Sequence, residues 1–427
     1  MARARSGRRS ASLPWRRILS FSVLQAFSAV APLLVLPVVV GLVDVRGWVA
    51  LSLGYVIGAT ASIAVNYGWP MTGPSRIASL GIEESVAVFL ESLWMRCLVA
   101  VPSLIVAVVV AVALAPSEFR LLSALMVVAV ASSGLASNWY YIGKGDPGGI
   151  LKYEALPKLV GTLSAIPVVA LTHRGEGYPI CLLVATMGGT LMSCYRIVRL
   201  APHAKMPRVG LRRRVVDYGL VASAAVLGAG YTSLALPIMQ ISGGSLTAIA
   251  DMAGGLRLRT MTQTAVSAGT TALQGWVAEK GVGTAGRHRM KVALVGSAAL
   301  GGGCCIFLTV LGPPLADLLF GSAAHVGFEL ALLTGAACVP YALSASLSFH
   351  ILAPLEKWRP VAASRVAGTV IGVPLIVGAS AYFGAAGTAA AMLIAESVVV
   401  LIQARLALVA LRKPSGGSDN DVLIAGV

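Results

Sequence analysis

Two arginines, Arg257 and Arg259, interrupt a largely apolar stretch, Thr247–Glu279, that the sequence predicts to be one membrane-crossing helix. If this helix begins near Gly244, Arg257 lies about 20 Å along it at about 1.5 Å per residue. That depth is well inside a hydrocarbon core about 30 Å thick. A guanidinium there is costly unless it faces protein, water or an anion. The pair therefore indicates either an anion-binding site or ion pairs that only hold the helices together.

Helical periodicity separates the two arginines. At about 100° per residue they point in nearly opposite directions, so we expect one cavity not to hold both. The side of the helix that carries Arg259 is polar, with Thr262, Gln263, Thr270 and Gln274. The Arg257 side carries mostly small residues, which suit close helix packing. We therefore assign Arg259 and Gln263 to a water-filled cavity and leave the position of Arg257 open.

Three further ionisable residues are candidates. Arg76 follows a Pro70–Pro74 break at the cytoplasmic end of the second predicted span, where a phosphate contact and a positive-inside anchor are equally good interpretations. Glu396, in the middle of the last span, is a candidate for coupling transport to an ion, and pairing with a neighbouring helix is the alternative. Asp251, about a quarter-turn from Arg259, is the second ion-coupling candidate.

Composition identifies an integral membrane protein. The chain has 427 residues, of which 57% are hydrophobic and 12% are charged, and its mean hydropathy is +0.83. A soluble protein carries about 25% charged residues. The net charge of +16 does not indicate nucleic-acid binding, because the Lys and Arg residues lie at the ends of apolar segments, where positive-inside topology explains them.

Hydropathy predicts an all-α polytopic membrane protein with about 12 transmembrane helices. The predicted spans are Ile18–Val40, Trp48–Val65, Leu93–Ala115, Leu121–Tyr141, Leu156–Leu171, Gly177–Val198, Tyr218–Ile241, Leu246–Gly275, Val292–Phe320, Phe328–Phe349, Val361–Phe383 and Ala386–Leu411. A basic linker between the sixth and seventh spans predicts two six-helix lobes related by a pseudo-two-fold axis. The predicted domains are a basic N-terminus (1–17), an N-terminal lobe (18–200), the linker (201–216), a C-terminal lobe (217–412) and a disordered tail (413–427).

Loop charges set the orientation. With the N-terminus inside, the predicted outer loops carry only Arg46, Arg120 and Arg174, and the other basic loop residues fall on the inner side. This alternation predicts a multi-pass protein of the cytoplasmic membrane with both termini cytoplasmic.

Motifs for enzymatic chemistry are missing. Gly281, Gly283 and Gly286 match GxGxxG formally, but no strand precedes them, and no Walker or zinc motif or nucleophile elbow occurs. The six cysteines lack metal-ligand spacing. We expect no catalytic residues, no metal and no cofactor.

Four short motifs occur in a recognisable order. They are Asn66–Pro70 (NYGWP), Ser75–Ala78 (SRIA), Asn138–Gly143 (NWYYIG) and Leu318–Gly321 (LLFG). In this order the chain resembles the polysaccharide flippases (O-antigen transporter type) of the multidrug/oligosaccharidyl-lipid/polysaccharide exporter superfamily. Two positions depart from that pattern: Ile142 replaces a usual Gln, and Gly41 replaces a frequent Arg.

The resemblance implies two lobes around a central cavity that opens alternately to either side. It also implies a substrate, an oligosaccharide linked to polyprenyl pyrophosphate, which the protein moves from one leaflet of the membrane to the other. Membrane lipid and a polysaccharide polymerase are the further partners that the resemblance implies. Arginine suits phosphate because its planar fork bonds two oxygens, so Arg259, Arg257 and Arg76 are the phosphate candidates.

Three alternatives stay open. An ion-coupled multidrug exporter would need buried carboxylates, whereas arginines are the embedded excess here. A peptidoglycan-precursor (lipid II) flippase would be expected to carry more cationic residues in its first two spans. A membrane polymerase or glycosyltransferase would need a large outer loop or a catalytic acidic pair, and every predicted outer loop is short.

Overall fold

A computed structural model describes residues 35–206, 211–278, 284–355 and 357–412. These residues form helices and connecting loops, with no strand among them, which confirms the all-α polytopic class. The predicted N-terminus (1–17), the tail (413–427) and most of the first predicted span lie outside the described residues. Of that span only residues 35–40 are described, and they belong to a helical segment at 35–42.

The first half of the chain forms the N-lobe, defined here as α2 to α9. Its elements are α2 (Val45–Asn66), α3 (Trp69–Ile77), α4 (Ile82–Leu114), η1 (Ser117–Phe119), α5 (Arg120–Ala131), η2 (Ser132–Leu135), α6 (Asn138–Lys144), α7 (Pro147–Ile150), η3 (Leu151–Ala155), α8 (Leu156–Thr172) and α9 (Gly177–Leu200).

The second half forms the C-lobe, defined as α10 to α17. Its elements are α10 (Leu211–Gly228), α11 (Gly230–Ser233), α12 (Ala235–Ile241), α13 (Leu246–Ala278), α14 (Thr284–Phe320), η4 (Gly321–Ala323), α15 (Phe328–Ala336), α16 (Cys338–Ser346), η5 (Leu347–Leu352) and α17 (Trp358–Arg412). Gly384 breaks α17 with φ 55° and ψ −131°, so this element is two helices, as hydropathy predicts.

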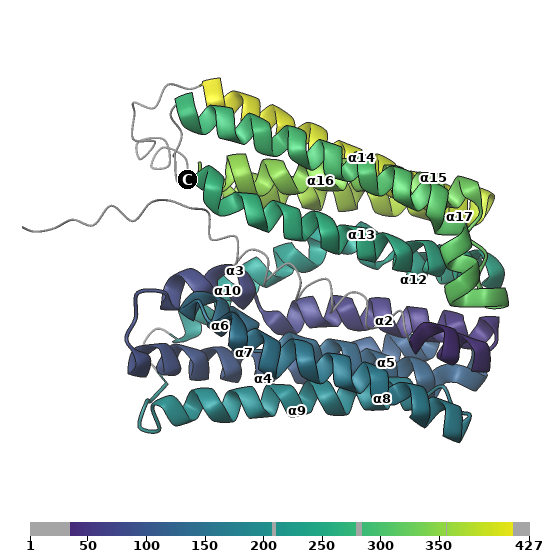
Figure 1. The fold of residues 1–427 in the computed structure, drawn as a ribbon, viewed down its shortest axis with the longest axis horizontal. Coiled ribbons are helices and arrows are strands. Elements are labelled where there is room, and N and C mark those ends of the chain that lie inside the picture. The colour runs from purple at the N-terminus through teal and green to yellow at the C-terminus, as the bar shows by residue number, and fades with distance from the viewer. Residues whose placement is uncertain (1–34, 207–210, 279–283, 356, 413–427) are drawn as a thin grey trace, which may run out of the picture.

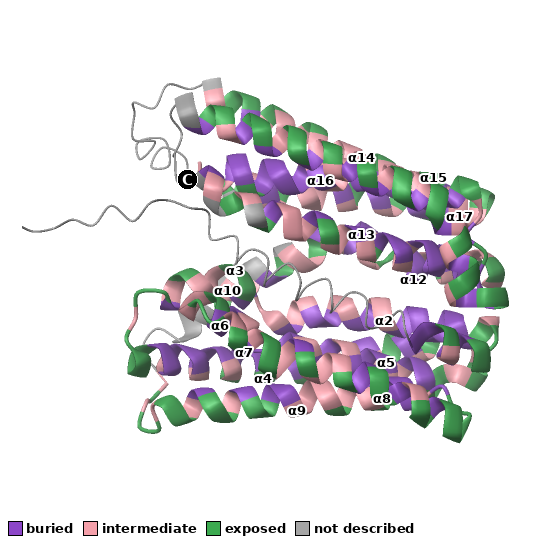
Figure 2. Ribbon diagram, in the orientation of Figure 1, coloured by how far each residue is buried: buried purple, intermediate pink, exposed green. Residues whose placement is uncertain are grey.

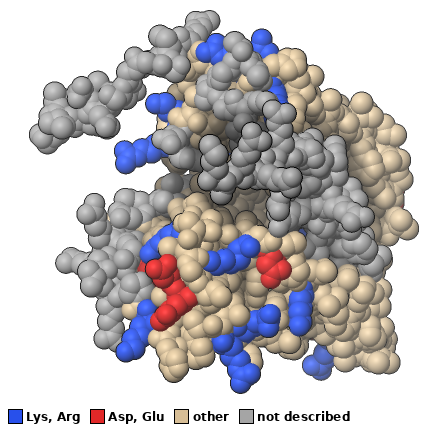
Figure 3. Space-filling model, turned by 60° about the vertical axis from the view of Figure 1, so that its left-hand side comes forward, with Lys and Arg blue, Asp and Glu red and all other residues tan. Residues whose placement is uncertain are grey.

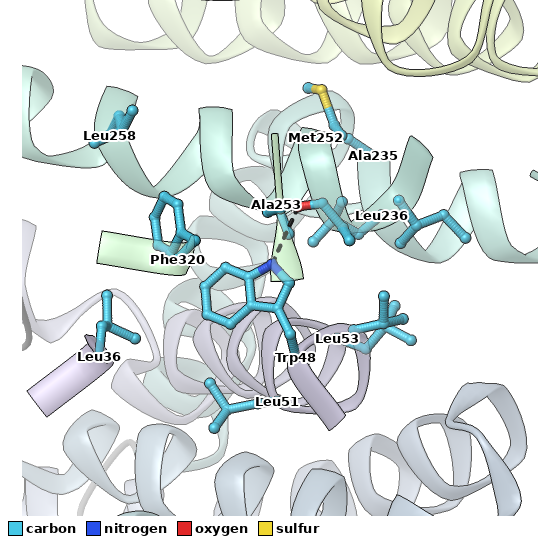
Figure 4. Close-up of a cluster of buried hydrophobic side chains, with 14 of the residues drawn as sticks. Leu36, Trp48, Leu51, Leu53, Ala235, Leu236, Met252, Ala253, Leu258 and Phe320 are labelled. Atoms are coloured by element: carbon cyan, nitrogen blue, oxygen red, sulfur yellow. Dashed lines mark hydrogen bonds between the residues drawn. The ribbon is translucent and has the colours of Figure 1, made fainter. Parts of the chain in front are cut away.

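Figure 1 shows α2 to α9 in one group and α13 to α17 in a second group. Helix α2 is the main N-lobe element at the boundary, because it packs against α10, α11, α12 and α13. In the first turn of α2, the Trp48 indole N–H donates to the carbonyl of Ala250, 3.1 Å away, and its ring lies 4.9 Å from that of Phe320 (Figure 4). This contact closes the two lobes together at the end that loop charges assign to the outside.

Glycines let α2 approach its own lobe closely. A Cβ added at Gly54 would lie 2.5 Å from the Ser123 carbonyl oxygen of α5, and one at Gly58 would lie 2.9 Å from the Val127 oxygen. Small residues at such crossings are typical of membrane helices, where van der Waals contact replaces the hydrophobic effect as the driving force. Helix α2 is therefore fixed to α5 on one face and available to the C-lobe on the other.

Lipid-facing surfaces are apolar. Eight stretches among the described residues are long and apolar enough to cross a membrane. Exposed residues lie on the outward faces of both groups (Figure 2), and on α4 they include Val101, Ile105 and Val109. Figure 3 brings the left-hand end of Figure 1 forward, where Lys and Arg outnumber the acidic residues in view. This is the end that the sequence assigns to the cytoplasm.

The close approach of α2 and α5 gives a stability prediction. Replacing Gly54 with Ala should destabilise the protein by about 1–3 kcal/mol, because the added methyl group overpacks a backbone contact. Gly296→Ala is the matched control, since no atom lies within 4 Å of the added Cβ and Ala is the better helix former. Thermal unfolding in detergent measures both, and equal melting temperatures would contradict the packing account.

Candidate substrate-binding site

A cavity of about 260 Å³ lies between the lobes. Its walls come from α2, α11, α12, α13 and α17. The polar and charged lining residues are Ser52, Tyr55, Thr232, Ser233, Arg257, Arg259, Thr260 and Gln263. Both arginines line this one cavity, so the expectation that a single cavity would not hold both is wrong. Helical angle fixes where a side chain leaves the backbone, whereas a long arginine side chain can bend around its helix.

Arg257 contacts the N-lobe through aromatic groups. Its guanidinium carbon lies 4.0 Å from the centroid of the Tyr55 ring, a cation–π arrangement. The hydroxyl of Tyr178, a buried residue on α9, interacts with the same guanidinium. The Arg257 Nε atom is buried and has no hydrogen-bond partner among the described residues. As a whole the Arg257 residue is half-buried, and it lines the cavity. The groups that hold its guanidinium are neutral.

Arg259 is held differently. Its Nη2 donates to Oε1 of Glu396 on α17, 2.8 Å away, and both residues are buried, with 2% and 3% of their surface exposed. The Tyr231 hydroxyl lies beside the same carboxylate. The pair joins α13 to α17 inside the C-lobe. This geometry matches the alternative interpretation of Arg259, in which a buried carboxylate compensates the charge, and it likewise matches the pairing alternative for Glu396.

The remaining predicted residues occupy three different places. Gln263 lines the cavity, one turn beyond Arg259 on α13. Asp251 is outside the cavity lining and accepts a hydrogen bond from the His325 backbone N–H at 2.7 Å. Asp251 lies more than two helical turns before Arg259 on α13. Because Glu396 pairs with Arg259, the two ion-coupling candidates do not lie next to each other.

Arg76 belongs to a second polar cluster, away from the cavity lining. Its Nη2 lies 3.1 Å from Glu91 Oε2, and its Nη1 donates to the Tyr218 hydroxyl at 2.9 Å. The Trp69 ring stacks on Tyr218, with centroids 4.6 Å apart. Tyr218 belongs to α10, so this cluster joins the lobes at the end that the sequence assigns to the cytoplasm.

Arg96 is an embedded arginine that the sequence analysis does not single out. It is fully buried in the N-lobe, where its Nη1 donates to the carbonyls of Gly134, at 3.3 Å, and Ala136, at 2.7 Å. These carbonyls lie in and directly after η2, where the chain leaves helical geometry before α6. The sequence places Arg96 at the start of a span at Leu93, whereas α4 begins at Ile82. The signal that could have found it is the acidic first turn of α4, which favours a helix N-terminus.

No group of three or more potential metal ligands occurs among the described residues. The six cysteines are free, and Cys304 and Cys338 are buried. Their sulfurs contact Thr262, which is consistent with a packing role.

The chain has the fold of known membrane transporters. An inward-facing structure of a multidrug resistance MATE family transporter of the MOP superfamily covers 94% of this chain and 99% of its own, with a TM-score of 0.68 and 16% identity. A lipid II flippase, MurJ, in an inward closed conformation, covers 91% of this chain and 87% of its own, with a TM-score of 0.64 and 12% identity. No family model and no curated protein matches the chain.

An outward-facing structure of a multidrug resistance MATE family transporter, with a TM-score of 0.50 to this chain at 14% identity, shares the same fold.

The buried pair gives a double-mutant prediction. Either Arg259→Leu or Glu396→Leu should destabilise the protein by about 3–5 kcal/mol, because each leaves the partner charge buried and uncompensated. The double variant should recover most of that loss, since it buries no charge. Thermal unfolding of the four proteins in detergent measures the coupling.

The exposed pair Arg46–Glu118 supplies the control for this experiment. It has a similar distance, 3.0 Å, but both side chains are more than half exposed, so Arg46→Leu should change stability little. Additive effects of the two buried substitutions would refute the coupling.

Proposed function

We propose that this protein is a flippase that moves a polyprenyl-pyrophosphate-linked oligosaccharide across the cytoplasmic membrane by alternating access. The observation that carries the proposal is Arg257. It lines the cavity between the lobes, and no carboxylate lies within 4.0 Å of it among the described residues. Arg257 replaces Arg259 as the leading phosphate ligand, because Glu396 already compensates the charge of Arg259.

The charge of the cavity favours an anionic ligand. Its described lining contains two arginines and no Asp or Glu, and the Glu396 carboxylate balances one of them. One positive charge therefore remains for a ligand. A phosphate group suits it, since arginine bonds two phosphate oxygens at once. The hydroxyls of Ser52, Thr232 and Thr260, with the Gln263 amide, supply donors and acceptors suited to phosphate or sugar.

The size of the cavity suits part of such a ligand. Its volume of about 260 Å³ lies below the roughly 300–1,000 Å³ of sites that enclose a drug-sized molecule. In this conformation it would hold a head group and not a whole oligosaccharide, and the lipid tail would stay in the bilayer. Arg76 is then a candidate for an earlier contact at the cytoplasmic end, and Glu396 and Asp251 remain candidates for ion coupling.

Two further functions use the same fold. Lipid II flipping fits the same anionic chemistry, and a flippase with that name shares the fold. Export of cationic drugs would fit the likeness to multidrug transporters, but an uncompensated arginine in the cavity disfavours a cation. The proposed location is the cytoplasmic membrane with both termini inside, and a polymerase on the outer side is the proposed recipient of the glycan.

Deleting the gene should separate these functions. For the oligosaccharide flippase we expect the complete lipid-linked unit to accumulate on the cytoplasmic leaflet and surface polymer to be lost, because flipping is the blocked step. Mass spectrometry of extracted lipid-linked glycans measures this. Accumulated lipid II would favour the peptidoglycan precursor instead, and an unchanged glycan profile with new sensitivity to cationic dyes would favour drug export.

Arg257→Gln should reduce flipping at least tenfold without reducing the amount of protein, because it removes the free charge and no buried ion pair. Proteoliposomes with a fluorescent polyprenyl-pyrophosphate sugar measure the rate. Arg199→Gln is the matched control, since Arg199 also lies over a tyrosine ring, Tyr195 at 4.8 Å, but on an exposed part of α9. Equal rates in the two variants would remove Arg257 from the substrate site.

A further inference from the structure

The Arg257 side chain crosses the boundary between the lobes. It starts from α13 of the C-lobe, and its contacts are Tyr55 on α2 and Tyr178 on α9, both in the N-lobe. Its depth is about 16 Å from the start of α13, at about 1.5 Å per residue. The nearby Arg259 forms its ion pair within its own lobe, with Glu396. The ligand-binding arginine is therefore also a connection between the two halves of the molecule.

The partners of Arg257 leave much of its bonding capacity unused. A guanidinium has five N–H donors, and here it meets a ring face and a phenol hydroxyl. Its Nε is buried without a hydrogen-bond partner among the described residues. A buried donor that lacks an acceptor gains when a better acceptor arrives. A phosphate is such an acceptor, because charge-assisted bonds to it are about twice as strong as bonds between neutral groups.

Binding a phosphate and holding the N-lobe therefore compete for one side chain. A ligand shifts a conformational equilibrium only by its different affinity for the two states. A head group that withdraws Arg257 from Tyr55 and Tyr178 binds better to a state in which the lobes have parted there. A neutral sugar offers no such competition, since it cannot neutralise the guanidinium.

We propose that Arg257, Tyr55 and Tyr178 form a releasable tether that holds the outer side closed in the empty carrier and that a pyrophosphate head group opens. This proposal rests on the proposed function and adds the regulation of the same site. Tyr55 and Tyr178 act as positioning residues: they hold the guanidinium at the cavity wall until the anion takes it. The Trp48 contact with Ala250, nearer the start of both helices, has to open in the same transition.

Distances between spin labels test the tether. Ser117 of η1 and Ser322 of η4 are exposed, lie in different lobes and can be changed to Cys, with the exposed Cys97 changed to Ser. In the otherwise native protein, millimolar inorganic pyrophosphate should increase the population of molecules in which the two labels lie farther apart. Tyr55→Leu should raise that population about threefold to tenfold without ligand, as expected for a lost cation–π contact, and pyrophosphate should then add little.

Two variants keep the test decisive if Tyr55→Leu folds poorly. Tyr55→Phe retains the ring face and should behave like the native protein. Tyr178→Phe removes only a hydroxyl and should give a smaller increase of the same kind. Tyr195→Leu is the matched control, because it removes a tyrosine ring that lies under Arg199 on the exposed surface of α9. It should not change the distances between the labels, with or without pyrophosphate.

The outcomes separate the tether from the proposed function. If pyrophosphate binds by calorimetry in an Arg257-dependent way but the tyrosine variants leave the distances unchanged, the tether is overturned and the anion site stands. If Tyr55→Leu lengthens the distances but pyrophosphate neither binds nor shifts the native protein, release by an anion is overturned together with the proposed function. If pyrophosphate and Tyr55→Leu each increase the distance between the labels, and the two together increase it no further, the tether is supported.

Discussion

The cost of a positive charge in an apolar interior constrains this molecule more than any other interaction. Four arginines of the described chain each meet that cost with a different kind of partner. Arg259 pairs with the carboxylate of Glu396, and Arg96 donates to backbone carbonyls. Arg76 uses Glu91 and a phenol, and Arg257 uses the face of an aromatic ring. Neither Arg96 nor Arg257 has a carboxylate partner among the described residues, but of these two only Arg257 lines the cavity, which is why the proposed ligand belongs there.

Breaks in the helices supply several of these partners. Regular helix stops at η2 and resumes at α6, and Arg96 binds carbonyls in and directly after η2. The break at Ala229 ends α10 and places Tyr231, on α11, beside Glu396. Non-helical backbone is tolerated at membrane depth only where protein or water satisfies it. The irregular segments and the buried polar side chains therefore satisfy each other's hydrogen-bonding groups.

Hydropathy located most of the described spans because they are long apolar segments, and Gly384 divides the last two. It did not predict that the span Tyr218–Ile241 is divided into α10, α11 and α12. It failed at Arg96, since the glutamates at the start of α4 lower the local hydropathy and hide the first turns of that helix. Helical periodicity also failed to predict that Arg257 and Arg259 line the same cavity. The partners of the two α13 arginines were beyond sequence reasoning, because Glu396 lies 137 residues from Arg259 and Tyr55 lies in the other lobe.

The proximity of Arg257 and Arg259 on one helix has a mechanical consequence. The buried pair with Glu396 fixes α13 to α17, so α13 moves with the C-lobe as a unit. Arg257, two residues earlier, reaches the N-lobe through contacts that are weaker and reversible. If both arginines were uncompensated, closing the lobes over an empty cavity would confine two positive charges at close range. With one of them neutralised inside its own lobe, the empty carrier confines a single charge, and one anionic head group is enough to balance it.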